Sequence, residues 1–529
     1  MPVQLTAPGV YIEEIPSGVR TITGVATSIT AFVGRTKWGP VAEPTLLGSF
    51  GEFERKFGGL WQDSPLSYAV RDFYLNGGSQ ALIVRLFKPG VSTDGVAKTA
   101  SLGGAYGSGS AGGGGGGLLL EASSPGEWGN KLTVSVDTNV PGDSSGVAAR
   151  LGVATADLFN LTVTYDGVQE VVVRNVTVKE SARRVDRVLE QESRLVRVQK
   201  SIVTGLPLLP LPAVATNVPF TGGSDSVALT STELIGSEGD KTGLFSLEKA
   251  DLFNLLCIPP DTRAGATPDT VYQAAFKYCE KRRAMLVVDS DGTWNSPSAA
   301  LAGVTTMGLT GPAGRNAAIY FPRVVEADPL REGQPDTFVP CGIVAGVMAA
   351  TDATRGVWKA PAGIDAAMTG VQRLSVDLTD LENGTLNDEG VNCFRAFPVF
   401  GRVVWGARTM RGANQLADEY KYVPVRRLAL YIEESLYRGL KWVVFEGNDE
   451  PLWAQIRLNV GAFMHTLFLQ GAFQGKSSRD AYLVKCDKET TTQDDINRGV
   501  VNILVGFAPL KPAEFVILKL QQLAGQIAV

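Results

Sequence analysis

Residues 252–289 read LFNLLCIPPDTRAGATPDTVYQAAFKYCEKRRAMLVVD, and this stretch decides the fold class. The apolar runs at 252–258 and 285–289 predict two buried strands. Residues 270–283 between them predict a helix. A strand, a helix and a second strand in this order predict a right-handed βαβ unit, and therefore a layered α/β fold.

The same alternation is found near the start of the chain. Residues 28–34 predict an apolar strand closed by a glycine, and residues 81–87 predict a second buried strand. Two helices are expected between them, one over 49–58 with a serine N-cap and a glycine stop, and one over 64–76. This region therefore belongs to the same layered core.

Residues 91–240 interrupt the pattern with a segment rich in Gly, Ser, Thr and Val. Alternating runs at 131–136 and 161–165 predict strands, and residues 181–192 predict a helix. We therefore expect a β-rich domain inserted in a loop of the α/β core. The predicted organisation is an N-terminal arm at 1–25, a first core segment at 26–90, the inserted β-rich outer domain at 91–240, a second core segment at 241–505 and a C-terminal arm at 506–529.

The last third of the chain holds the strongest helix signals. Apolar side chains recur at three- and four-residue steps from Leu428 to Gly439 and again from Leu452 to Leu467. Both apolar faces are expected to pack on the core sheet.

Both ends of the chain carry β-prone runs next to prolines, PGVYIEE at 8–14 and FVILKLQQL at 515–523. A lone strand leaves its backbone N–H and C=O groups unsatisfied, so each run is expected to pair with a sheet of a neighbouring subunit. Residues 8–15 and 513–523 are therefore predicted to form intermolecular β-sheet with two neighbours. The candidate arm residues are Val10, Tyr11, Ile12, Glu13, Phe515, Val516, Ile517, Leu518 and Leu520.

Composition excludes several classes of protein. The 529 residues are 44% hydrophobic and 19% charged, as expected for a folded protein of several domains. A net charge of −5 offers no basic field, so no direct nucleic-acid partner is expected. No apolar run approaches the roughly 20 residues of a membrane helix, and the start does not resemble a secretory signal. We expect assembly in a bacterial cytoplasm, without membrane insertion.

Motifs for catalysis or metal binding are weak throughout the sequence. The 5 cysteines are widely spaced and odd in number, which favours reduced core thiols, and the single histidine, His465, has no second histidine for a zinc site or a triad. Residues 107–112 fit G-x-G-x-x-G, but no strand precedes them and no helix follows, which favours a flexible loop. One alternative stays open, an acid/base or Mg²⁺ cluster at strand ends formed by Asp289, Asp291, Asp352, Asp377 and Asp380. We expect no catalytic residue, no metal and no cofactor.

Many local strings, in the same order along the chain, are similar to those of one protein family. They include PGVYIEE at 8–14, TSITAFVG at 27–34, PGEWGN at 125–130, YCEKRR at 278–283, RGVWKAPAG at 355–363, LNDEGVN at 386–392, VWGART at 404–409, KYVPVRR at 421–427, FEGN at 445–448 and PAEF at 512–515. The chain thereby resembles the sheath proteins of contractile tails, as in myophages and phage-tail-like injection systems. The resemblance covers nearly the whole chain except the glycine tract and parts of 135–225.

The resemblance implies a structural motor. Sheath subunits of this family form hexameric rings that stack helically around an inner tube, assemble in a stretched state, and contract to drive the tube through a membrane. The implied partners are neighbouring sheath subunits, the inner tube protein, and baseplate and terminator or cap proteins. Two other classes remain as alternatives: an α/β enzyme with an inserted lid, and a static surface-layer or capsid lattice protein.

Two further expectations concern the faces of such a subunit. A Gly/Ser/Thr-rich insertion is best tolerated where few inter-subunit contacts cross it, so the inserted domain is expected on the outer surface. Exposed charges suit a releasable contact because they are weak and screened by salt. We therefore expect the tube-facing side in the C-terminal part of the core, at residues 381–389 and at the helix charges Glu433, Glu434, Arg438 and Lys441. The alternative, that these charges form an ordinary solvated helix face, remains open.

Overall fold

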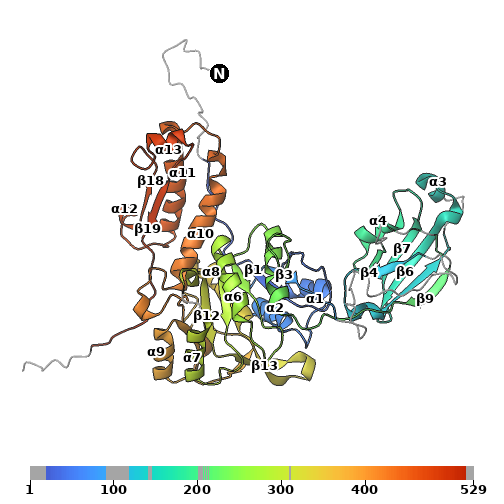
Figure 1. Ribbon diagram of the computed structural model, residues 1–529, viewed down its shortest axis with the longest axis horizontal. Coiled ribbons are helices and arrows are strands. Elements are labelled where there is room, and N and C mark those ends of the chain that lie inside the picture. The colour runs from blue at the N-terminus through green and yellow to red at the C-terminus, as the bar shows by residue number, and fades with distance from the viewer. Residues whose placement is uncertain are drawn as a thin grey trace, which may run out of the picture.

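A computed structural model describes residues 20–90, 118–140, 146–199, 207, 209, 211–212, 214–308 and 311–519. Figure 1 shows three regions along an elongated outline. A central α/β body carries a β-rich domain at one end. At the other end stands a lobe that contains β18 (Tyr482–Lys485) and β19 (Leu504–Phe507).

The central body is built on an eight-stranded sheet with the order β17-β16-β12-β11-β10-β1-β3-β2. Its six inner strands run parallel, and the two edge strands, β2 and β17, are antiparallel to their neighbours. The strands are β1 (Thr30–Gly34), β2 (Thr45–Leu47), β3 (Ala81–Arg85), β10 (Leu255–Cys257), β11 (Met285–Asp289), β12 (Ala317–Phe321), β16 (Val391–Phe397) and β17 (Gly401–Val404). Because β1 lies between β3 and β10, chain segments on both sides of residues 91–240 form one sheet. The predicted α/β class and the βαβ unit are confirmed.

Both faces of this sheet are covered, which explains why its strands are continuous apolar runs. Phe32 of β1 points into one apolar cluster, while Ala31 and Val33 point into another. The helices of the first face are α1 (Phe50–Phe57), α2 (Pro65–Leu75) and α8 (Cys341–Arg355). Those of the second face are α5 (Ser231–Ile235), α6 (Asp269–Lys281), α7 (Pro297–Met307) and α9 (Asp380–Asp388).

The β-rich domain has an apolar cluster of its own. A four-stranded sheet with the order β7-β6-β5-β9 lies beside the two-stranded sheet of β4 and β8. The elements are β4 (Leu120–Ala122), β5 (Leu132–Asp137), α3 (Val147–Leu151), β6 (Leu158–Tyr165), β7 (Val168–Thr177), α4 (Val185–Glu192), β8 (Val196–Val198) and β9 (Ala215–Pro219). Figure 1 shows this domain standing away from the central body on a narrow connection.

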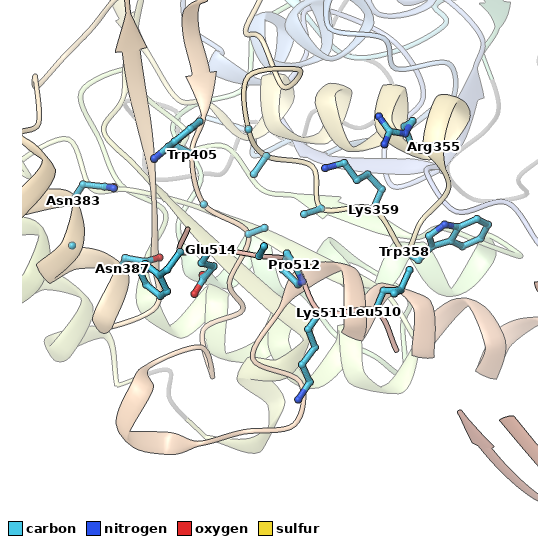
Figure 2. A pocket seen from close by; sticks show the side chains of 18 of the residues that line it. Arg355, Trp358, Lys359, Asn383, Asn387, Trp405, Leu510, Lys511, Pro512 and Glu514 are labelled. Carbon is cyan, nitrogen blue, oxygen red and sulfur yellow. The ribbon is translucent and has the colours of Figure 1, made fainter. Parts of the chain in front are cut away.

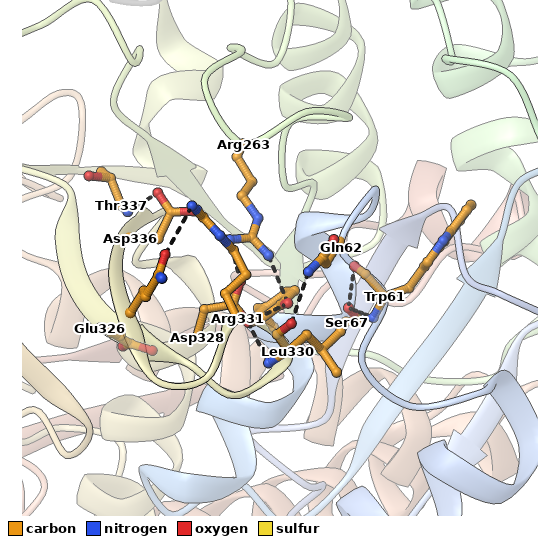
Figure 3. Close-up of polar contacts among 12 residues, drawn as sticks. Trp61, Gln62, Ser67, Arg263, Glu326, Asp328, Leu330, Arg331, Asp336 and Thr337 are labelled. Carbon is orange, nitrogen blue, oxygen red and sulfur yellow. Dashed lines mark hydrogen bonds and ion pairs between the residues drawn. The ribbon is translucent and has the colours of Figure 1, made fainter.

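A small antiparallel sheet, β14-β13-β15, is held to the central body by a buried polar network. Its strands are β13 (Val324–Asp328), β14 (Gln334–Phe338) and β15 (Val371–Leu374). Arg263 lies 2.6 Å from both Asp328 and Asp336, and its guanidinium donates to the hydroxyl of Tyr68 at 2.7 Å (Figure 3). Tyr68 in turn donates to Asp328 at 2.8 Å. These charge-assisted contacts fix the hairpin against α2.

A second polar group beside it holds two carboxylates close together. Asp72 of α2 and Glu326 of β13 are 1% and 2% exposed, and both contact the guanidinium of Arg71. Burial raises the pKa of the Glu326 carboxyl, and the nearby charge of Asp72 raises it further. Glu326 therefore keeps a proton in the folded protein at pH values where the unfolded chain has lost it.

Glu326→Gln is expected to make folding stability less dependent on pH. In the native chain, stability falls as pH rises from the ordinary glutamate pKa to the raised folded value, by up to about 1.4 kcal/mol per pH unit for one proton. Glutamine mimics the protonated acid, so the variant should be the more stable protein at pH 8. Denaturation midpoints of the unassembled protein between pH 5 and pH 9 measure this, with the exposed Glu332→Gln on the same hairpin as the control. A native-minus-variant difference that stays constant across this range contradicts the prediction.

Candidate assembly surface at the chain ends

The C-terminal lobe packs around an apolar cluster separate from those of the central sheet. It contains α10 (Val423–Gly439), α11 (Glu450–Leu469), α12 (Ser478–Ala481), α13 (Gln493–Asn497) and the hairpin of β18 and β19. Helix α10 joins the lobe to the central body, since Leu430 belongs to the sheet cluster and Leu428 to the lobe. The expectation that both helices pack on the core sheet is wrong for α11, whose apolar face meets β18 and α10. Periodicity predicts an apolar face but not what covers it.

The first described residues lie along this lobe. Ile22 is buried in its apolar cluster, and the backbone N–H of Arg20 donates to the Asn459 side chain at 3.1 Å. The N–H of Val25 donates to the Ser435 hydroxyl at 3.2 Å. The N-terminal segment is thus fixed to α10 and α11 from residue 20 onward.

The last described residues cross from the lobe to the central body. After β19, the carbonyls of Ala508 and Pro509 accept hydrogen bonds from Gln474, at 2.9 and 2.8 Å. Glu514 then contacts the Arg408 guanidinium with both carboxylate oxygens, at 2.7 and 2.6 Å. The hydroxyl of Tyr422 donates to the same carboxylate at 3.1 Å. Strand β19 runs past the boundary expected at 505, and the chain remains anchored as far as Glu514.

A groove of about 1100 Å³ lies between this C-terminal segment and the central body. Residues 510–515 form one wall, and Trp358, Lys359 and Trp405 line the groove from the central body (Figure 2). Asn387 of α9 lies beside Glu514 at one end. The segment therefore has open space on one side and a single charged anchor on the other.

The hairpin of β18 and β19 has open edges in the described part of the chain. Its antiparallel register pairs Tyr482 with Phe507 and Lys485 with Leu504, and no third described strand joins it. A two-stranded sheet presents unpaired N–H and C=O groups on both outer edges, which is a template for further strands.

The predicted arm residues have different outcomes. Val10, Tyr11, Ile12, Glu13 and Leu520 lie outside the described residues, as does the G-x-G-x-x-G match at 107–112. The four apolar side chains at 515–518 are described and are 72–82% exposed, with no strand assigned. Such exposure of four successive apolar residues is unusual unless a partner covers them. Their pairing with a neighbour stays a prediction.

The four predicted tube-facing charges do not form the exposed set that the sequence suggested. Glu434 is only 10% exposed and lies between Arg283 at 2.9 Å and Arg438 at 2.7 Å. Arg438 also pairs with Asp251 at 2.7 Å. The expectation of exposure is therefore wrong for Glu434, because Arg283 and Arg438 cover it. Glu433, 43% exposed, and Lys441 remain available to solvent.

Several of the residues considered for chemistry have structural roles. All 5 cysteines are buried and free, and burial raises the pKa of the Cys393 thiol to about 12. Asp289 accepts from the Cys341 N–H at 2.9 Å, Asp352 pairs with Arg427 at 2.6 Å, and Asp380 pairs with Arg395 at 2.8 Å. Among the described residues, no three Asp, Glu, His or Cys side chains converge as a metal site.

No helix among the described ranges has the length and apolarity required to cross a lipid bilayer.

Two family models match this chain. The model of the phage tail sheath central domain matches residues 244–410, and that of the phage tail sheath C-terminal domain matches residues 417–522, together more than half of the chain. The chain belongs to the contractile tail sheath family. The "Tail sheath protein" of Vibrio phage KVP40 is 28% identical over 179 residues, which is 34% of this chain. The match spans 25% of that relative's length.

Solved structures of sheaths have the same fold. The contracted sheath complex of an extracellular contractile injection system, PVC, covers 98% of this chain and 98% of its own, with a TM-score of 0.57 and 20% identity. The contracted helical sheath of the anti-feeding prophage covers 98% and 100%, with a TM-score of 0.55 and 22% identity. The sheath resemblance inferred from short strings therefore holds at the level of family and fold.

Proposed function

We propose that this chain is the structural subunit of a contractile sheath that polymerises as stacked hexameric rings around an inner tube and contracts to drive the tube through a target membrane. The observation that carries the proposal is that the described segments nearest the two ends are anchored to the subunit, and that no third described strand joins the hairpin of β18 and β19, in a chain of the tail sheath family. Its partners are other copies of this chain, the tube protein, and baseplate and terminator proteins. It assembles in the bacterial cytoplasm and has no catalytic role.

Strand exchange supplies the links between subunits. The described chain begins against α11, and its last anchored residue, Glu514, lies beside α9, at a separate place on the subunit (Figures 1 and 2). Two arms that leave from separate places reach two different neighbours, and the open edges of β18 and β19 offer them backbone partners. Because the arms are tethers, subunit bodies slide and rotate during contraction while the lattice stays connected.

The inserted β-rich domain faces outward in this proposal. It has its own apolar cluster and a narrow connection, so it does not need neighbouring subunits for burial. An outward position leaves the central body and the C-terminal lobe for contacts within the sheath and with the tube.

Negative-stain microscopy of the purified full chain tests the proposed function. Long striated hollow tubes are the expected result. Discrete small oligomers would contradict the proposal and favour the enzyme alternative, while flat sheets or closed shells would favour a static lattice.

Charge reversal on α10 tests the proposed tube contact. Glu433 and Lys441 are chosen because they are the exposed members of the set, although Glu433 also pairs with Arg426 at 3.2 Å. Glu434 is buried, and Arg438 pairs with both Glu434 and Asp251. We expect Glu433→Lys with Lys441→Glu to lower the fraction of extended, tube-filled sheaths at least twofold, and raised salt to lower it in the native protein, since exposed charge contacts are screened.

The matched control is the exposed pair Lys277→Glu with Glu280→Lys on α6, which also preserves net charge. Electron micrographs of sheaths assembled with tube protein give the extended fraction. An unchanged fraction in the α10 variant would place the tube contact elsewhere.

A further inference from the structure

The anchor of Glu514 differs from the other contacts of the C-terminal segment. Among residues the structure describes, the hydrogen bonds from segment 510–514 to the rest of the chain all end on the Glu514 carboxylate. Burial alone would raise the pKa of this carboxyl, but the hydrogen bonds and charge of Arg408 hold it below its usual range. Glu514 is therefore ionised and paired at neutral pH, and the segment depends on this one residue.

Arg408 is a rigid receptor for that carboxylate. Its side chain is 0% exposed. Besides Glu514, its guanidinium donates to the Asn387 carbonyl at 2.6 Å, the Asn414 side chain at 3.1 Å and the Gly412 carbonyl at 3.3 Å. A planar guanidinium held by this many acceptors presents a fixed two-pronged site to a carboxylate.

Two sequence strings that point to the family are joined here. VWGART at 404–409 contains Arg408, and PAEF at 512–515 contains Glu514. The two residues are 106 positions apart in the chain, yet they meet in a bidentate ion pair. One residue from each string, Arg408 and Glu514, thus helps to hold the chain immediately before the exposed run at 515–518.

We propose that Arg408 and Glu514 form a latch that sets the free length of the C-terminal arm; this inference rests on the proposed function. With the latch closed, the free arm begins at Phe515. With the latch open, the last anchor is Pro509, whose carbonyl bonds Gln474. Residues 510–514 then join the tether and lengthen its reach by about 17 Å in extended conformation.

The surroundings allow such opening without disturbing the core. Lys511 and Ala513 are exposed, and the groove of about 1100 Å³ leaves space beside the segment. Pro512 lies within the segment and Pro509 directly precedes it, and both disfavour helix and central-strand structure, so the segment has no competing local fold. Release therefore costs the ion pair, the hydrogen bond from Tyr422 and the partial burial of Pro512, and it leaves the buried Arg408 guanidinium held only by its carbonyl and amide acceptors.

Spin-label mobility tests the latch in the unassembled full chain. The native cysteines are buried, so a nitroxide on Lys511→Cys labels one place. We expect slow motion of this label in the native background. Glu514→Ala and Glu514→Gln should shift its spectrum toward that of a label on Ile517→Cys, which reports the free arm. The exposed Glu280→Gln on α6 is the matched control and should change nothing.

Glu514 is changed rather than Arg408, because Arg408 also binds core carbonyls and its loss endangers folding. An unchanged thermal midpoint shows that the Glu514 variants are folded. A label at 511 that stays slow in both variants overturns the latch, whether or not the protein forms tubes.

Tube order gives the second readout. We expect Glu514→Ala to form tubes whose layer lines in averaged Fourier transforms are weaker than those of the native protein and of Glu280→Gln, since a longer tether couples subunits less tightly. If residues 510–514 become mobile in Glu514→Ala while its layer lines stay as strong as those of the native protein, the ion pair holds this segment but does not determine the free length of the arm. Absence of tubes from the native protein would instead refute the proposed function and leave the mobility result standing.

Discussion

Removal of residues 515–529 is expected to leave a folded protein that no longer forms tubes. The described portion of this segment has no strand, and its side chains at 515–518 are 72–82% exposed, so the body loses little burial when they are absent. If the arm supplies a strand to the open hairpin of a neighbour, its loss removes one link from every subunit. Sedimentation velocity should show only small species, and micrographs should show no tubes.

The truncation begins after Glu514, so the ion pair between Glu514 and Arg408 is kept. The truncated chain therefore tests the connection between subunits without disturbing the fold of one subunit. A thermal midpoint within about 1 °C of the native value is expected for the truncated chain. Lys519→Ala, which keeps the arm, is the control and should form normal tubes. Tubes of normal length from the truncated chain would refute strand exchange through the C-terminal arm.

A second measurement separates the arm from its acceptor. An excess of a synthetic peptide with the sequence of residues 513–529 should inhibit tube formation by the native chain, because it competes for the same open edges. The same residues in scrambled order provide the control peptide. Inhibition by both peptides to the same degree would count against specific pairing.

Much of the central body is predictable because its signals are local. Ser49 and Gly58 mark a helix that the structure places at Phe50–Phe57, with the Ser49 hydroxyl accepting from the Glu52 N–H at 3.3 Å and Gly58 at φ 93°. The apolar run at 285–289 is strand β11 without a change of bounds. Helix caps and strands buried on both faces can be predicted because the residues responsible are close together in the sequence.

Contacts between segments that are far apart in the chain have no local sequence signal, so they could not be predicted. The sequence predicts that the charged residues of α10 form an exposed face. In the structure, Arg283, which follows α6, covers Glu434. Arg408 and Glu514 were visible as members of two family-like strings, yet nothing in either string indicates that they meet. Spacing within one helix tells which side chains share a face, whereas tertiary packing decides which of them stay in water.

The joint between the central body and the β-rich domain is another such contact. Arg85, at the end of β3, is 1% exposed and donates to the carbonyls of Gly39 and Pro125, both at 2.7 Å. Pro125 belongs to the β-rich domain. The rings of Trp38 and Trp128 pack across the same joint, with centroids 5.6 Å apart. Burial lowers the pKa of Arg85 to about 9.

Arg85→Met is therefore expected to cost about 3 kcal/mol of folding free energy and to loosen the joint. Methionine fills some of the volume but leaves buried carbonyl oxygens without donors, at roughly 1–3 kcal/mol for each group that water does not reach. Arg85→Lys should be intermediate, because an ammonium keeps the charge but lacks the planar fork that reaches several carbonyls at once.

Denaturation of the unassembled protein, followed by tryptophan fluorescence, measures both effects, because Trp38 and Trp128 at the joint contribute two of the 8 tryptophans to the signal. We expect an early transition in Arg85→Met that is absent from the native chain. The control is Arg174→Met, which removes an exposed arginine from β7 within the same domain. A native-like midpoint in Arg85→Met would mean that the remaining contacts of the joint, such as the Trp38 ring and the hydrogen bond from the Gly39 N–H to Ser124, hold the domain without the buried arginine.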